Sequence, residues 1–163
     1  MIQTFSDGAI EWFIDRDRRV LFGHWSGDFG GEDLLEASPV LWQQYPELAE
    51  YGAIHDLLDF TGIVEHRYAR ELTRRLAELF GEPNPHRRTA IVAVDPMKVF
   101  ELKATKADAP ESRQLRLFGN NTVALEWVTA DEPDNPSACS RPNAERLPWW
   151  FERKGAVAKL SVR

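Results

Sequence analysis

The sequence predicts an α/β domain with a mixed sheet, in which an antiparallel opening hairpin leads into a parallel core with helices packed on it. Apolar and polar residues alternate over 10–15, which is typical of a half-buried strand, and residues 20–25 are predicted to form a second strand. Two continuous apolar runs, 53–60 and 89–94, are typical of strands covered on both faces of a parallel sheet. A helical repeat at 67–80 separates these runs, so strands and helices alternate and right-handed crossovers are expected.

The opening hairpin is predicted from a spacing of two residues in its first strand. Ile10, Trp12 and Ile14 would share one face of that strand. The polar run 15–19 then suits a tight turn, and the second strand begins after it.

A first helix is predicted after the glycine-containing connection 27–31. Glu32 and Asp33 place negative charge at its start, which the helix dipole favours. Pro39 lies inside the helical pattern. It is expected to kink the helix or split it in two, because proline lacks an N–H and clashes with the preceding turn. The Tyr-Pro pair at 45–46 is expected to end the helix.

The helix at 67–80 is the best-specified element of the chain. Glu71 and Arg75 are spaced for an i,i+4 ion pair in the favourable order. Gly81 and Pro83 are expected to end the helix. Its apolar side consists of Tyr68, Ala69, Leu72, Leu76, Leu79 and Phe80.

Three further elements are predicted after the strand at 89–94. They are a helix over 97–107, a strand over 115–118 and a last helix, which Asn120 or Asn121 would cap.

We divide the chain into an α/β domain, residues 1–130, and a linker with an aromatic, basic C-terminal tail, residues 131–163. Prolines recur in the linker among Asp, Asn and Ser, as in irregular segments. The tail holds an aromatic cluster, Trp149, Trp150 and Phe151, which would be a large apolar surface if left in water. We hypothesise that this cluster docks on an apolar patch, either of its own domain or of a second copy in a homodimer.

Composition excludes several classes of protein. The net charge of −6 disfavours nucleic-acid binding, where basic residues must replace phosphate counterions. No stretch approaches the roughly 20 apolar residues that cross a bilayer, and the first residues do not have the pattern of a signal peptide. The single cysteine, Cys139, excludes an internal disulfide and fits a reducing compartment. We therefore expect a cytoplasmic protein, and a bacterial one.

No recognisable catalytic, metal or cofactor motif is present, so we expect a protein that is not an enzyme and has no cofactor. The alternative is a small enzyme or metal-binding protein in which His55, Asp59 and His66 converge at the end of one strand. His55 and Asp59, four residues apart, would share one side of that strand, with Asp56 on the other. The favoured interpretation is that Asp59 caps a turn through backbone N–H groups of residues 61–62.

Tryptophan is abundant, with six residues in 163. Trp12, Trp25, Trp42 and Trp127 lie on apolar stripes, and core packing is the simplest interpretation. They could equally line an apolar cavity, because aromatic walls are common in ligand pockets. The sequence leaves these two interpretations open.

Several phrases resemble the SpoIIAA-like family, a branch related to the STAS domains of sulfate transporters and anti-sigma-factor antagonists. They are SGDFGGEDL, IHDLLDFTG, RTAIVAV and LFGNNTVALEWV, within a resemblance that covers about residues 8–129. The resemblance implies a sheet whose parallel core follows an antiparallel opening. It also implies a non-enzymatic binding or regulatory role, with a non-polar small molecule or a protein as the partner.

One departure from that family concerns its phosphorylation switch. Antagonist STAS domains carry an Asp-Ser-Ser-Gly box, whose serine is phosphorylated, after the strand equivalent to 53–60. Here the sequence is Asp-Phe-Thr-Gly over 59–62, with no serine, so we do not expect Thr61 to act as that switch. Asp59, Thr61 and His66 remain the candidate functional loop.

Overall fold

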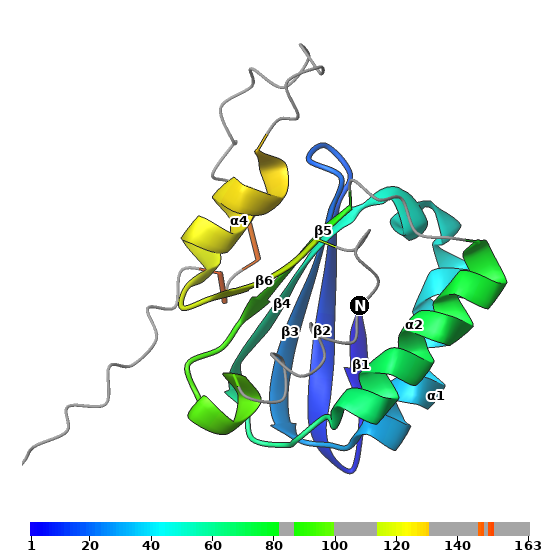
Figure 1. Ribbon diagram of the computed structural model, residues 1–163, viewed down its shortest axis with the longest axis vertical. Helices are drawn as coiled ribbons and strands as arrows, with labels where there is room; N and C mark the ends of the chain where they lie inside the picture. Colours follow the sequence, from blue (N-terminus) through cyan, green and yellow to red (C-terminus); the bar gives the residue numbers. More distant parts are fainter. Residues whose placement is uncertain (82–86, 100–113, 131–146, 149, 152–163) are drawn as a thin grey trace, which may run out of the picture.

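A six-stranded sheet in the order β1-β2-β3-β4-β5-β6 forms the centre of the computed structural model (Figure 1). The structure describes residues 1–81, 87–99, 114–130, 147–148 and 150–151. The strands are β1 (Ile2–Thr4), β2 (Asp7–Asp15), β3 (Val20–Asp28), β4 (Gly52–Phe60), β5 (Arg88–Val92) and β6 (Gln114–Phe118). The helices are α1 (Gly31–Gln44), the short 3₁₀ helix η1 (Pro46–Glu50), α2 (His66–Phe80) and α4 (Asn121–Thr129).

Strand directions confirm the predicted mixed sheet. β2 pairs antiparallel with β1 and with β3, whereas β3, β4, β5 and β6 are parallel neighbours. The predicted strands 53–60 and 89–94 correspond to β4 and β5, which are adjacent and central. The short edge strand β1 was not predicted, because three residues are too few for an alternation to stand out.

Helix α1 contains Pro39 and continues through it to Gln44, so of the two expected effects of Pro39 the split is wrong, and the kink stays a prediction. Pro39 removes the N–H that would bond to the carbonyl of Leu35, one turn earlier. Arg75 Nη1, on α2, lies 3.5 Å from that carbonyl oxygen. A donor from the neighbouring helix therefore takes the place of the missing backbone N–H, and the helix continues.

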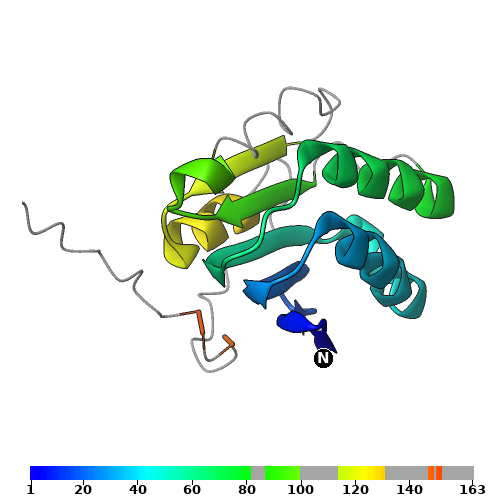
Figure 2. The same ribbon diagram turned by 90° about the horizontal axis from the view of Figure 1, so that it is seen from below.

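Helix α2 packs beside α1 on one face of the sheet, while α4 lies on the other face (Figures 1 and 2). Glu71 is 2.9 Å from Arg75 Nε, as the i,i+4 spacing predicted, and it also pairs with Arg74. These guanidinium groups lower the pKa of Glu71 to about 2. Gly31 lets α1 approach α2 closely, because an added Cβ there would overlap the ring of Tyr68.

The predicted cap of the last helix is confirmed at Asn120, whose side chain accepts a hydrogen bond from the Val123 N–H at 3.0 Å. Of the predicted helix 97–107, the described part is helical from 96 to 99, and the rest lies outside the described residues. The linker 131–146 and Trp149 also lie outside them.

Two hydrophobic clusters sandwich the sheet. The first lies under α1 and α2 and includes Trp12, Trp25, Phe29, Leu41, Trp42 and Phe60. The second lies under α4 and includes Val20, Phe22, Ile54, Val92, Ala124, Trp150 and Phe151. No helix among the described residues is both long and apolar enough to cross a bilayer.

Candidate functional site

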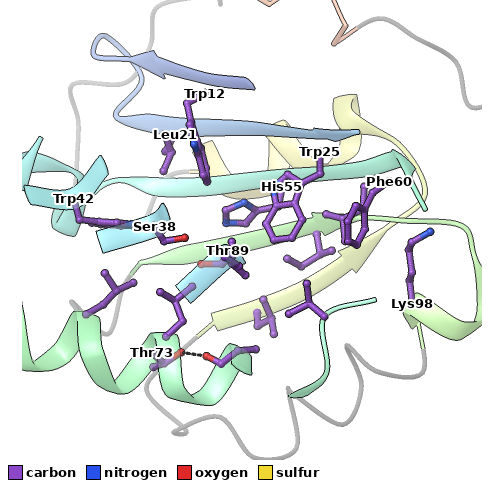
Figure 3. A pocket seen from close by; sticks show the side chains of 18 of the residues that line it. Trp12, Leu21, Trp25, Ser38, Trp42, His55, Phe60, Thr73, Thr89 and Lys98 are labelled. Carbon is purple, nitrogen blue, oxygen red and sulfur yellow. Dashed lines mark hydrogen bonds between the residues drawn. The ribbon is translucent and has the colours of Figure 1, made fainter. Parts of the chain in front are cut away.

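A cavity of about 150 Å³ lies between the sheet and helices α1 and α2 (Figure 3). Its sheet wall comes from β2, β3, β4, β5 and β6, and its other wall comes from the two helices. We call it the helix-side pocket. The residues most used below are Trp12, Trp25, Trp42, His55, Phe60, Ala69, Leu72, Arg87, Thr89 and Lys98.

The sheet wall of this pocket is aromatic. His55 of β4 packs edge-on against Trp12, with ring centroids 6.0 Å apart, and against Trp25 at 5.7 Å. Gly23 of β3 lies between Trp12 and His55. An added Cβ at Gly23 would come within 2.7 Å of the Trp12 ring. Glycine at this position therefore lets Trp12 lie flat over the strand and form the pocket wall.

The helix wall is formed by the apolar stripe of α2, with Leu72 and Leu76 among its residues. No described residue of α2 is fully buried, so the helix rests on side chains that are only half-covered. Trp42 and Ser38 of α1 complete this wall. A helix that stands off the sheet in this way leaves room between them.

Two polar groups of the pocket wall are buried without a hydrogen-bond partner among the described residues. They are the Trp25 indole N–H and the Thr89 hydroxyl. Buried polar groups are nearly always paired, because leaving one unpaired costs about 1–3 kcal/mol. Such groups in an apolar pocket are typical of sites that bind a ligand with its own polar atom.

The pocket has a cationic side chain at each end. The Arg87 guanidinium lies 4.5 Å from the ring centre of Trp42. Lys98 Nζ lies 5.5 Å from the ring centre of Phe60, which Figure 3 shows at the opposite end from Trp42. Among the described lining residues there is no aspartate or glutamate.

The other face of the sheet carries a buried polar cluster that the sequence analysis missed. His24 Nε2 lies 3.4 Å from Asp59 Oδ2, and His24 Nδ1 lies 3.9 Å from Asp56 Oδ2. Asn121 donates its side-chain N–H to Asp56 at 2.6 Å, and the Leu58 backbone N–H donates to the same carboxylate at 2.9 Å. The sequence signal that could have found this cluster is Asp56, an aspartate inside an apolar strand, because a buried carboxylate requires partners.

A bulge in β4 explains why the sequence analysis misplaced Asp59. The β3–β4 register passes from His24↔Asp56 to Ser26↔Asp59, so two residues of β4 oppose Trp25 alone. Such a bulge reverses the alternation of side chains beyond it. Asp59 therefore lies beside His24 with Asp56, whereas His55 faces the helix-side pocket, and the expectation that His55 and Asp59 share one side is wrong.

The predicted loop residues Thr61 and His66 are both exposed. The Thr61 backbone N–H donates to the Gly27 carbonyl at 2.8 Å, so the turn cap by Asp59 is not formed through that group. The described residues contain no group of three or more His, Cys, Asp or Glu that could hold a metal ion. A joint functional role for Asp59, Thr61 and His66 stays a prediction.

Within the aromatic cluster of the tail, Trp150 and Phe151 pack on the α4 side of the sheet. Trp150 is 0% exposed, and its ring stacks on His24 with centroids 5.0 Å apart. Phe151 packs edge-on against Phe22 of β3 at 5.9 Å. This position matches the first of the two docking alternatives, a patch of the chain's own domain.

Comparisons with known proteins concern the fold alone. No protein-family model matches the chain, and a comparison with curated proteins finds no match. One similar solved structure is an uncharacterized protein of the DUF3478 family from Shewanella loihica PV-4, described as having a SpoIIAA-like fold. The match has 16% identity and a TM-score of 0.48, and it covers 78% of this chain and 98% of that one.

Proposed function

We propose that this protein is a non-enzymatic binding module whose ligand is a small, largely non-polar molecule held in the helix-side pocket. The observation that carries the proposal is an aromatic-lined cavity of about 150 Å³ with two buried polar groups in its wall. A cavity of about 150 Å³ has room for a molecule as large as benzene.

The argument for binding starts from the apolar surface of the pocket wall. Most of the lining side chains are aromatic or aliphatic. Apolar surface that is removed from water stabilises by about 25 cal/mol per Å². A ligand that covers this wall would therefore gain free energy, which supports binding as the use of the pocket.

Binding is favoured over catalysis by the way in which His55 is held. Its ring is part of the aromatic wall, in contact with Trp12 and Trp25. The Thr73 hydroxyl in the same pocket donates to the Ala69 carbonyl of its own helix at 2.9 Å. These contacts are those expected in the wall of a mostly apolar binding pocket.

Thermal unfolding with and without toluene tests the proposal. A ligand that binds the folded state alone raises the melting temperature, with a gain of about 2.7 kcal/mol at one hundred times its dissociation constant. Ala69→Phe would fill the pocket from α2, and this variant should show no shift with toluene. Val123→Phe adds the same group at an exposed position of α4 and should respond like the parent. An equal response of all three proteins, or no response, contradicts the proposal.

A further inference from the structure

We propose that the ligand of the helix-side pocket is a small aryl carboxylate, with its anionic group held at the Lys98 end. This inference rests on the binding function proposed above and adds the chemical class and the orientation of the ligand. It follows from the charges of the pocket wall, from the donors at one end, and from the shape of the remaining space.

The described pocket wall carries cations and no acidic side chain. Lys98 and Arg87 can only donate hydrogen bonds, and so can the indole N–H of Trp25. An anion would be attracted by both cations, and its oxygens would accept from the donors.

The Lys98 end is favoured because an ammonium group lies beside the aromatic wall there. Lys98 Nζ lies 5.5 Å from the centre of the Phe60 ring. Figure 3 shows Lys98 beyond Phe60, at the end of the pocket opposite to Trp42. A carboxylate at this end would face the ammonium group while its ring lies among the aromatic side chains.

The existing partner of Lys98 leaves its ammonium available to a second anion. Asp95 Oδ2 is 3.4 Å from Lys98 Nζ, longer than the 2.7–2.9 Å typical of a charge-assisted bond. Asp95 also accepts the Met97 backbone N–H at 2.8 Å, and that bond is the main cause that lowers its pKa. The Asp95 side chain is 49% exposed, whereas that of Lys98 is 10% exposed, so Lys98 is the more enclosed member of the pair.

The apolar part of the ligand is expected to be a single aromatic ring. Trp12, Trp25 and Phe60 present ring faces and edges to the pocket, and such surfaces favour edge-to-face contact with another ring. A volume of about 150 Å³ holds one ring with a small substituent. Benzoate is therefore the probe of choice.

The test compares benzoate with nitrobenzene, a neutral molecule of nearly the same shape, by isothermal titration calorimetry. We expect benzoate to bind about five- to tenfold more tightly, the range for a charge-assisted contact that is partly open to solvent. Lys98→Met keeps the alkyl stem and removes the charge, and it should bring the two affinities together. Arg16→Met removes a cation from the β2–β3 turn, outside the pocket lining, and should keep the benzoate preference.

The possible outcomes separate this inference from the binding function. Equal binding of benzoate and nitrobenzene by the parent protein overturns the anionic ligand but leaves the pocket as a binding site. A preference that survives in Lys98→Met, or that is lost in Arg87→Met alone, overturns the placement of the anion. Failure of both probes and of toluene overturns the binding function itself. If Lys98→Met does not fold, Lys98→Gln serves as the second variant, with the same expected result.

Discussion

The two faces of the sheet are packed in opposite ways. On the α4 side, Trp150, Phe22 and Ala124 are completely buried, and the described residues close over the strands. On the α1/α2 side, large aromatic side chains surround a cavity of about 150 Å³. The same strands supply both faces, so the difference arises from what covers them. The cavity lined by described residues is on the α1/α2 side, and we interpret that side as the one that binds.

Buried polar groups occur on both sides of the sheet. On the α4 side, the Asp56 carboxylate receives two hydrogen bonds and lies near His24. Buried polar atoms without a partner among the described residues belong to Trp25 and Thr89 on the α1/α2 side, and to Asn121 and Trp150 on the α4 side. The cavity, and not the pairing of polar atoms, is therefore what distinguishes the α1/α2 side.

The largest effect is expected on the α4 side, from Trp150→Ala. The indole fills the space over Phe22 and His24, so its removal should lower the free energy of unfolding by about 3–5 kcal/mol. Chemical denaturation measures this loss. Trp150→Phe keeps a ring and should lose much less. An unchanged stability of Trp150→Ala would mean that this face is not closed by the tail.

A smaller loss is expected from Asp56→Asn. Leu58 donates to Oδ1 and Asn121 donates to Oδ2, so the new amide keeps an acceptor for one donor and presents an N–H to the other, and the expected cost is about 1–3 kcal/mol. The matched control is Asp59→Asn, because Asp59 lies near the other ring nitrogen of His24, Nε2. The Asp59 side chain is 43% exposed, so its change should cost at most about 1 kcal/mol. Equal losses in the two variants would contradict the distinct environments of the two carboxylates.

On the α1/α2 side, removing a polar atom should do no harm. Thr89→Val replaces a buried hydroxyl that has no partner among the described residues by a methyl group of the same size. We expect stability to stay the same or to rise by about 1 kcal/mol. Thr73→Val is the control variant. It removes a hydroxyl that donates to the Ala69 carbonyl, so no gain in stability is expected. Destabilisation by Thr89→Val of more than about 1 kcal/mol would show that the hydroxyl has a structural partner.

The smallest effect concerns pH and the outer surface of α2. Hydrogen bonds from Arg74 and Arg75 lower the pKa of Glu71 from its ordinary value of 4.5 to about 2. A lowered pKa in the folded state means that the interaction stabilises the protein fully above pH 4.5 and is lost as the pH falls through about 2. The melting temperatures of the parent and of Glu71→Gln should therefore differ slightly at neutral pH and converge towards pH 2. A difference that is independent of pH would contradict this origin.

Regular elements were predictable from the sequence because their signals are local. Alternation over 10–15, the apolar run at 89–94 and the stripe of 67–80 each reflect one period and one buried side. The unbroken α1 was not predictable, because the donor that lies near the Leu35 carbonyl comes from Arg75, forty residues away.

The candidate site was only partly predictable, for the same reason. Tryptophans at 12, 25 and 42 were recognised as core or cavity residues, and the structure places all three in the pocket wall. The bulge that places Asp59 on the same side as His24 depends on how β4 pairs with β3. No pattern within the sequence of β4 indicates that pairing. The position of Trp150 likewise depends on a surface formed by distant strands.

The most direct test of the difference between the two faces is a two-dimensional ¹H–¹⁵N NMR titration that follows the tryptophan indole N–H signals as toluene is added. Trp25 lies in the wall of the helix-side pocket, and Trp150 lies in the closed α4 side. Our account predicts a saturable shift of the Trp25 indole signal, which Ala69→Phe abolishes, while the Trp150 signal stays in place. A shift of Trp150 without one of Trp25 would contradict the account.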